Sequence, residues 1–490
     1  SASNPGSDMA ILVGDTLYFD ANDGSTGVEL WAHDTSNAST WRVADINSGS
    51  VSSSPGNYMS ILVGDTLYFS ASDQSSGSEL WAHDTSNAST WRVADIRSGS
   101  SASNPGSDMA ILVGDTLYFG ATDASSGWEL WAHDTSNAST WQVADIFSGS
   151  GSSYPGDYMS ILIGDTLYFS AYDASSGREL WAHDTSNAST WRVTNINSGG
   201  TSTLGQYMSI LVGDTLYFDA WDASSGIELW AHDTSNASTW RVADINSGAD
   251  SSYPGQYMET LVGDTLYFSA TDGSSGIELW AHDTSNASTW RVADINSGSS
   301  SNPGQFMEIL IGDTLYFSAN DGSSGSEVWA HDTSNASTWR VADIYSGTGS
   351  SIPGYYMAIL VGDTLYFGAT DASSVWELRA HDPSNDTTWR VADIDSGTGS
   401  SYPGQYIEIF VGDTLYFSAT DASSGHELWA HDTSNASTWQ VADIRSGSSS
   451  SSPGYYMEIL VGDTLYFDAD DGSSDRELWA LDIEHSITYD

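Results

Sequence analysis

The sequence predicts an all-β protein, specifically a β-propeller of ten four-stranded antiparallel blades. The string Gly-Asp-Thr-Leu-Tyr-Phe occurs ten times, first at Gly14 and last at Gly462, with copies 49 or 50 residues apart. Each copy contains four short runs of strand-forming residues separated by turn residues, and no segment has a helical period of useful length. Four antiparallel strands in a unit of about 40–50 residues are typical of a propeller blade. One ring of ten blades is the expected arrangement, with two five-bladed rings, or an open or swapped array, as the alternatives.

The copies follow one another without long linkers, so we expect residues 1–490 to form a single repeat domain. The expected blades cover about 1–49, 50–99, 100–149, 150–199, 200–248, 249–298, 299–347, 348–397, 398–447 and 448–490.

Within the first copy, turn residues separate the four expected strands. Gly14-Asp15 lies between two apolar runs, as in a two-residue hairpin, while 23–27 and 35–39 are rich in turn residues. Segments rich in Ser, Gly and Pro join one copy to the next. The expected strands are 9–13, 16–21, 29–34 and 40–46.

Blades that stack between two neighbours should be apolar on both faces. The run Leu17-Tyr18-Phe19 fits this expectation, and we expect the two tryptophans of each unit, Trp31 and Trp41, to be buried. Their burial would stabilise each blade by several kcal/mol, at about 25 cal/mol per Å². In the last copy, residues 481–490 replace the tryptophan-containing fourth strand, and we expect them to form the outer strand of blade ten.

Composition excludes several classes of protein. The chain has 12 arginines and no lysine against 65 acidic residues, for a net charge of −53, so it would repel nucleic acid. It has no cysteine, which excludes disulfides and thiolate metal sites. No apolar run approaches the roughly 18 residues of a membrane span, and no apolar signal region opens the chain, so we expect a targeting segment to be absent or already removed. Such an acidic surface suits salty surroundings, and added salt should raise stability.

The repeat resembles a known family. Leu17-Tyr18-Phe19-Asp20-Ala21, Gly27-Val28-Glu29-Leu30-Trp31 and Val43-Ala44-Asp45-Ile46 are similar to the ELWxxDGT repeats of secreted or surface proteins of bacteria and archaea. The resemblance covers nearly the whole chain and implies an extracellular or cell-surface location, but no defined reaction. The blade spacing also resembles that of kelch repeats.

The chain departs from that family pattern at three places. The residues His33-Asp34-Thr35-Ser36-Asn37 stand where the family has Asp-Gly-Thr. The seventh copy has Val328, and the eighth has Arg379 in place of the tryptophan. The repeated His33-Asp34 pair is interpreted as hydrogen-bonded structure rather than as a catalytic pair, because it recurs in nine copies.

Sequence differences between the copies concentrate at one edge of the expected blades. They lie in the loop between the second and third strands and in the segments that join the blades, whereas the other turns barely vary. Neutral drift would favour small polar residues there, yet large aromatics and arginines appear, as in binding interfaces. The candidate ligand-binding residues are Arg97, Trp128, Phe147, Tyr172, Arg178, Trp221, Tyr345, Trp376, His426 and Arg445.

The turn before each fourth strand carries an N-glycosylation sequon. Such sequons lie in accessible turns of exported proteins, so N-linked glycans are expected, although duplication of one original sequon also explains the repetition. The acceptor residues are Asn37, Asn87, Asn137, Asn187, Asn236, Asn286, Asn335, Asn385 and Asn435.

Acidic clusters in the first and last copies suggest calcium as the candidate metal, since it prefers oxygen ligands. The alternative is that these carboxylates cap turns or pair across blades. The candidate ligands are Asp20, Asn22, Asp23, Asp468, Asp470 and Asp471, beside Asp475.

These observations predict a secreted or cell-surface binding or scaffold module. Its variable loops would recognise a glycan, a polymer or a surface protein. The alternatives are a polysaccharide-acting lyase or hydrolase and a purely structural component of the cell envelope. The sequence contains no nucleophile elbow, phosphate-binding glycine loop or zinc-binding helix motif.

Overall fold

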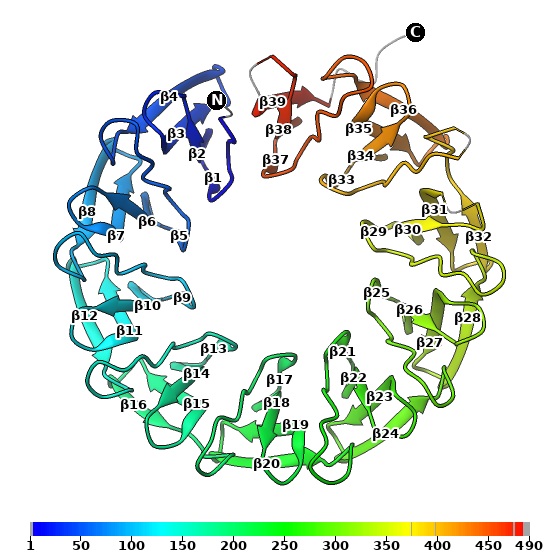
Figure 1. Ribbon diagram of the computed structural model, residues 1–490, viewed down its shortest axis with the longest axis horizontal. Helices are drawn as coiled ribbons and strands as arrows, with labels where there is room; N and C mark the ends of the chain where they lie inside the picture. Colours follow the sequence, from blue (N-terminus) through cyan, green and yellow to red (C-terminus); the bar gives the residue numbers. More distant parts are fainter. Residues whose placement is uncertain (1–2, 374, 397, 474–475, 484–490) are drawn as a thin grey trace. The chain divides into compact units, whose positions relative to one another are not determined.

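A computed structural model describes residues 3–373, 375–396, 398–473 and 476–483, and every regular element in this part of the chain is a β-strand (Figure 1). The strands form ten antiparallel sheets, each in the simple order of the sequence. Nine sheets have four strands, and the described part of the tenth has three. The fold is therefore the predicted ten-bladed β-propeller. The described residues include no helix that is long and apolar enough to span a membrane.

The strands recur with nearly the same bounds in every blade. The first strands are β1 (Ala10–Val13), β5 (Ser60–Val63), β9 (Ala110–Val113), β13 (Ser160–Ile163), β17 (Ser209–Val212), β21 (Glu259–Val262), β25 (Glu308–Ile311), β29 (Ala358–Val361), β33 (Glu408–Val411) and β37 (Glu458–Val461). The second strands are β2 (Thr16–Asn22), β6 (Thr66–Asp73), β10 (Thr116–Asp123), β14 (Thr166–Asp173), β18 (Thr215–Asp222), β22 (Thr265–Thr271), β26 (Thr314–Asn320), β30 (Thr364–Thr370), β34 (Thr414–Asp421) and β38 (Thr464–Asp470). The third strands are β3 (Val28–Asp34), β7 (Gly77–Asp84), β11 (Gly127–Asp134), β15 (Gly177–Asp184), β19 (Gly226–Asp233), β23 (Ile277–Asp283), β27 (Ser326–Asp332), β31 (Trp376–Asp382), β35 (Gly425–Asp432) and β39 (Arg476–Asp482). The fourth strands are β4 (Ser39–Ala44), β8 (Ser89–Ala94), β12 (Ser139–Ala144), β16 (Ser189–Arg192), β20 (Ser238–Ala243), β24 (Ser288–Ala293), β28 (Ser337–Ala342), β32 (Thr387–Arg390) and β36 (Ser437–Ala442).

The turns of each blade have the backbone conformations that their residues favour. Gly14 has φ of +60° in the hairpin that pairs Val13 with Thr16, and glycine adopts this left-handed region without steric cost. In the next hairpin, between β3 and β4, the left-handed position is occupied by Ala38, at φ +57°. The ladder between these two strands contains a β-bulge between Leu30 and Trp31.

The chain divides into two compact units. Unit 1 comprises Ser1–Gln206, Tyr456–Asp468 and Ser473–Asp490, and unit 2 comprises Tyr207–Tyr455 and Ala469–Gly472. Unit 1 thus contains blades one to four and most of blade ten, while unit 2 contains blades five to nine. Within each unit the first strands of the blades lie on the inner side of the arc and the fourth strands on the outer side (Figure 1).

Within each unit, each blade packs one face on the next blade through the same set of side chains. Between blades one and two, Tyr18, Leu30 and Ala32 pack against Leu67 and Phe69, and all five are buried. The same packing joins blade five to blade six within unit 2, and joins blade ten to blade one within unit 1. These contacts contradict two separate rings of blades one to five and six to ten, in which blade five would close on blade one.

The two tryptophans of each blade differ in burial, so the expectation that both are buried is wrong. Trp31 lies on β3 beside Phe19 and is half-buried, because this face of the blade packs on the preceding blade. Trp41 lies on β4, the outermost strand, where it is 41% exposed. Its counterparts Trp91, Trp141, Trp191, Trp240, Trp290 and Trp389 are similarly exposed.

The expected outer strand of blade ten lies largely outside the described residues, which end at Ile483 in this region. The backbone N–H of Ile483 donates to the carbonyl of Asp463 at 2.8 Å. Thr35 makes the same bond to Asp15 in blade one, so the turn after β39 begins as it does in the other blades.

Candidate functional site

The variable residues lie at one edge of the blades. Because the four strands form an antiparallel meander, the β2–β3 loop and the segment that leaves β4 share one edge, here called the crossover edge. The hairpins after β1 and β3 share the opposite edge, the turn edge. The segment from blade one crosses to blade two along this edge, where the Ser53 N–H donates to the Val28 carbonyl and the Ser72 N–H to the Ser53 carbonyl, both at 2.8 Å.

A buried glutamate fastens each crossover segment. Glu228 is fully buried, and its carboxylate accepts hydrogen bonds from the Ile245 N–H at 2.7 Å and the Ser252 hydroxyl at 2.8 Å. Burial raises the pKa of Glu228 to about 7, because desolvation disfavours the charged form more than these hydrogen bonds favour it. Blades one to nine all repeat this arrangement, with Glu29, Glu79, Glu129, Glu179, Glu228, Glu278, Glu327, Glu377 and Glu427 fully buried. The persistent Glu29 equivalents are thus structural fasteners, as the turn-capping alternative predicted.

In unit 1 the candidate ligand-binding aromatics are stacked in separate pairs. Trp128 stacks on Tyr154, with ring centroids 6.3 Å apart, and Phe147 stacks on Tyr172 at 5.5 Å. The first pair joins the start of β11 to a crossover segment, and the second joins the end of β14 to one. Of these four residues, Tyr154 is well exposed, at 44%, and the other three are half-buried.

The arginines of unit 1 at this edge are held by the protein itself. Arg178 is buried, forms an ion pair with Asp157 at 2.8 Å and lies over the ring of Tyr158 at 4.4 Å. Arg97 extends a guanidinium nitrogen to the carbonyl of Ala102 at 3.5 Å. Both arginines therefore brace crossover segments.

In unit 2 seven aromatic residues form two neighbouring ring clusters, which we together call the aromatic patch: Phe306, Tyr355, Tyr356, Trp376 and Tyr402 in the first, and Tyr406 and Tyr455 in the second. Tyr406 lies close enough to Tyr356 to affect its pKa. Trp376 lies at its centre, 5.3 Å from Tyr356, 5.9 Å from Tyr355 and 6.5 Å from Tyr402, measured between ring centroids. Tyr355 extends the patch to Phe306, at 5.6 Å. Blades seven to nine contribute to the patch, and Tyr455 joins it from the segment that leads into blade ten.

The second half of the patch surrounds His426. Tyr406 contacts the His426 ring at 4.9 Å and the Tyr455 ring at 5.1 Å. His426 is buried, its Nδ1 is 2.7 Å from the Thr420 hydroxyl, and desolvation lowers its pKa to about 4. The imidazole is therefore neutral at physiological pH.

The aromatic patch combines exposed rings with an uncharged setting. Tyr355 is 54% exposed and Tyr455 is 51% exposed, while Tyr356 and Trp376 are half-buried beneath them. Burial, together with the neighbouring tyrosines, raises the pKa of Tyr356, so its phenol keeps its proton. The patch can offer flat apolar faces and hydroxyl groups to a ligand, without a net charge.

Sequence comparison of the copies found Trp376 and His426 but not most of their partners. Tyr355 belongs to a Tyr-Tyr doublet after Pro-Gly that recurs only as Tyr455-Tyr456, a signal that was available. Tyr402 has φ of +47°, a left-handed conformation that the residue before Pro-Gly adopts in nine copies and that Thr203 adopts before Leu204-Gly205 in the fifth. The contacts between these residues, by contrast, depend on how neighbouring blades stack.

The other candidate ligand-binding residues of unit 2 lie outside the patch contacts. Trp221 is half-buried at the end of β18. Tyr345 lies over Gly349, where a Cβ would come within 2.0 Å of the tyrosine ring. Arg445 forms an ion pair with Asp470 at 2.5 Å.

The structure does not gather the candidate calcium ligands into one site. Asp20 is fully buried and accepts hydrogen bonds from the N–H groups of Asp8 and Met9 and the hydroxyl of Ser7, which caps the turn before β1. Asn22 accepts from the Gly24 N–H, and Asp23 accepts from the N–H groups of Ser25 and Thr26.

The acidic residues of blade ten are engaged in the same way. Asp468 accepts from the Tyr456 and Met457 N–H groups and pairs with Arg476. Asp470 pairs with Arg445, Asp471 follows it at the start of the loop, and Asp475 lies outside the described residues. Within the described ranges, no three His, Cys, Asp or Glu side chains converge as they would around a metal ion.

The nine sequon asparagines are exposed at the turn edge. Asn37 also serves the turn itself, because its Nδ2 donates to Asp34 at 2.6 Å and its Oδ1 accepts from the Ser39 N–H at 3.0 Å. His33, near the end of β3, forms a hydrogen bond between its Nδ1 and the Thr40 hydroxyl at 2.8 Å. This bond agrees with a structural role for the His-Asp pair. Glycosylation at these positions stays a prediction.

No family model matches the chain, and no curated protein matches it in sequence. Solved structures with a similar fold include a Mycobacterium tuberculosis puromycin-hydrolyzing peptidase (11% identity, TM-score 0.33, 75% of this chain and 58% of that chain). They also include a puromycin hydrolase (12%, 0.34, 85% and 58%) and an oligogalacturonate lyase in complex with manganese (14%, 0.31, 62% and 82%). The chain thus spans 58% of the length of the two hydrolases, and similarity of this degree carries no information on function.

Proposed function

We propose that the protein is a secreted or cell-surface binding module that holds a glycan chain on its aromatic patch. The observation that carries this proposal is the gathering of aromatic rings around Trp376, which draws residues from blades seven to nine within one unit. Exposed aromatic rings supply large contact areas with few rotatable bonds, and such residues dominate binding energy at interfaces.

The charge of the protein favours an uncharged ligand. At −53, the chain repels polyanions, and the patch itself contains tyrosines, a tryptophan, a phenylalanine and a neutral imidazole. A neutral polysaccharide meets no repulsion and presents apolar sugar faces to these rings. Contact with several rings at once would strengthen the binding of a long chain through multivalency.

The proposal is tested by affinity electrophoresis in gels that contain neutral polysaccharides, with Trp376→Ala as the variant. We expect the wild-type protein to be retarded by at least one of them, and Trp376→Ala to weaken that retardation at least tenfold. The matched control is Trp389→Ala, since Trp389 is equally a tryptophan of blade eight and 41% exposed, but lies on the outer strand β32. Equal loss in both variants, or retardation by no polysaccharide, contradicts the proposal and leaves a protein or another polymer as the ligand.

The sequons and the proposed location belong together, because N-linked glycans are added only to exported chains. All nine acceptor asparagines are exposed, which supports their use. Intact mass measurement of the protein from its own source should show added hexose units, and a mass equal to that of the bare chain contradicts glycosylation.

A further inference from the structure

The turn that precedes the first strand of a blade is capped by a side chain of the second strand. In blade nine, the Ser418 hydroxyl accepts hydrogen bonds from the Tyr406 N–H at 3.0 Å and the Ile407 N–H at 3.4 Å. Within the described residues, eight blades have a serine or an aspartate that accepts from one or both of these N–H groups. The capping residues are Asp20, Ser70, Ser170, Asp219, Ser269, Ser318, Ser418 and Asp468.

Blades three and eight have glycine at the capping position, Gly120 and Gly368. A glycine offers no side-chain oxygen to the turn. In blade eight, no described residue accepts a hydrogen bond from the N–H of Tyr356 or Met357, the two groups that the cap binds in the other blades. Blade eight therefore presents two neighbouring backbone donors without an acceptor.

The same two blades are the ones with a tryptophan at the start of the third strand, Trp128 and Trp376. In blade eight, Gly368 pairs with Leu378 and Thr370 pairs with Trp376. The glycine and the tryptophan are therefore diagonal neighbours on one face of the sheet. The missing cap and the large ring belong to one arrangement.

The two tryptophans differ in how they lie over the glycine. A Cβ placed on Gly120 would be 3.0 Å from Trp128 Nε1, so the indole of blade three takes the place of the cap. A Cβ placed on Gly368 would have atoms of Pro403 as its three nearest neighbours, at 3.5–3.8 Å. The Trp376 ring lies instead among the rings of the aromatic patch and does not take the place of the cap.

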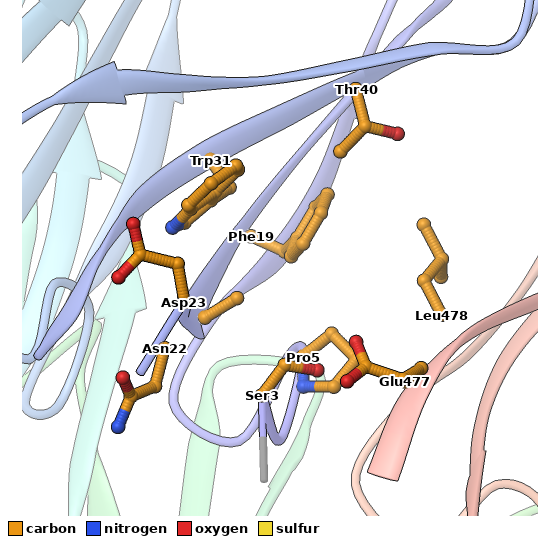
Figure 2. Close-up of a pocket in the computed structure, with 10 residues that line it drawn as sticks. Ser3, Pro5, Phe19, Asn22, Asp23, Trp31, Thr40, Glu477 and Leu478 are labelled. Carbon is orange, nitrogen blue, oxygen red and sulfur yellow. The ribbon is translucent and has the colours of Figure 1, made fainter. Parts of the chain in front are cut away.

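The segment that leads into the next blade forms the other side of the capping position. Pro403 belongs to this segment in unit 2. In unit 1, the equivalent Pro5 lies beside Glu477, near the start of β39 in blade ten (Figure 2). The proline thus bounds this position at the start of the third strand, next to the tryptophan in blade eight.

We propose that the two uncapped N–H groups beside Gly368 bind the carbonyl oxygen of an acetamido group, so that the aromatic patch selects glycans containing N-acetylated amino sugars. This inference rests on the proposed glycan-binding function and names the class of sugar. The ligand oxygen takes the place that the Ser418 hydroxyl has in blade nine. The acetamido methyl group and the sugar ring lie against Trp376 and Tyr356.

Reach and charge favour an acetamido oxygen over a hydroxyl or a carboxylate. A sugar hydroxyl could occupy the place of the serine hydroxyl only if the sugar ring itself replaced the serine Cβ. An acetamido oxygen is three bonds away from its ring, so the ring can stay outside, on the tryptophan. A carbonyl oxygen has two lone pairs, which can accept from both N–H groups. A carboxylate is disfavoured by the net charge of −53.

Two tetrasaccharides test the inference on the full chain. Chitotetraose and cellotetraose have the same β-1,4-linked backbone and differ in having an acetamido group or a hydroxyl group at C2. Isothermal titration calorimetry should show that chitotetraose binds at least tenfold more tightly, as expected for two added hydrogen bonds. Equal affinities overturn this inference but leave the aromatic patch as a glycan site. Binding of neither tetrasaccharide also overturns it, and the polysaccharide gels then decide the proposed function.

The variant Gly368→Ser tests whether the preference arises at this position. It supplies the cap that five other blades have, and its Cβ has room beside Pro403, so we expect the fold to be kept. Chitotetraose affinity should fall at least tenfold, to that of cellotetraose, while cellotetraose affinity stays the same. Gly120→Ser is the matched control, since it adds the same side chain to blade three in unit 1, and it should change neither affinity. An unchanged preference in Gly368→Ser, or an equal loss in both variants, overturns the inference.

Discussion

The two edges of each blade are fastened by equally regular hydrogen bonds, yet they differ in burial. At the crossover edge of blade five, Glu228 is fully buried and holds Ile245 and Ser252. At the turn edge of the same blade, Asp233 accepts the Ser235 N–H at 2.9 Å and an Asn236 amide proton at 2.5 Å, but in contact with solvent. Repetition of a contact in every copy therefore does not measure its energetic value, since an exposed group can replace a lost partner with water and a buried group cannot.

The largest effect is expected from removal of a buried fastener. Glu228→Ala leaves the Ile245 N–H and the Ser252 hydroxyl without a buried acceptor, which should lower the free energy of unfolding by about 2–4 kcal/mol. Glu477→Ala is the matched control and should cost less than about 0.5 kcal/mol, because no described residue donates to Glu477. Denaturant unfolding followed by tryptophan fluorescence measures the free energy of unfolding of both variants. Equal losses of stability would show that burial of the glutamate does not determine the size of the effect.

The pH dependence of the crossover edge gives the next effect. Burial raises the pKa of Glu228 to about 7 in the folded protein, from the ordinary glutamate value of 4.5. Its contribution to stability is therefore fully present below pH 4.5 and is lost as the pH rises to about 7. The stability of the wild type relative to Glu228→Gln should fall across this window and level off above it.

The turn edge supplies the contrast for that measurement. Hydrogen bonds, first from the Ser235 hydroxyl, lower the pKa of Asp233 below 3.8. Its contribution is lost only as the pH falls below that value, so the wild type relative to Asp233→Asn should show no change between pH 4.5 and 7. A parallel fall for both variants would contradict the assignment of the titration to the crossover edge.

Removal of a fastener at the turn edge should have a smaller effect than removal of Glu228. Asp233→Ala deletes the acceptor for Ser235 and Asn236, which water then replaces. We expect less than half the loss of stability seen in Glu228→Ala under the same unfolding conditions. A loss as large as that of Glu228→Ala would show that the turn controls the register of β19 and β20.

The smallest effect concerns the backbone of the same turn in blade six. Ala287 has φ of +60°, a left-handed conformation that is unfavourable for a residue with a Cβ. Ala287→Gly removes this strain but also increases the entropy of the unfolded chain. We expect a net stabilisation of about 0.5 kcal/mol. Thermal unfolding measures the gain. The control is Ala281→Gly in β23, which should destabilise, and a loss in both variants would argue against strain at Ala287.

The strands and their order could be predicted from the sequence because the repeat displays hairpin turns and strand-forming runs ten times over. The fourth strand was predicted to reach Ile46 but ends at Ala44, because the bulge beside Trp31 shifts the register and Ile46 turns to bond Glu29. Trp41 was predicted as core since its residue type resembles that of Trp31. Only the position of β4 at the outside of the blade exposes it.

The candidate site was predictable as an edge but not as a set of contacts. The variation of Trp376 and His426 between copies indicated the crossover edge, and the structure places both there. Whether such residues pair off, as Trp128 does with Tyr154, or join into a patch depends on distances between neighbouring blades. The sequence left open whether the acidic runs bind calcium or cap turns. Sequence spacing alone does not show that the Asp20 carboxylate accepts hydrogen bonds from backbone N–H groups.

The seams between blades have a genetic consequence. Tyr18, Leu30 and Ala32 meet Leu67 and Phe69 through residues that every copy repeats with little change. A deletion or duplication of one 49- or 50-residue copy would rejoin two surfaces that already match, so blade number is open to change by recombination while each interior stays intact.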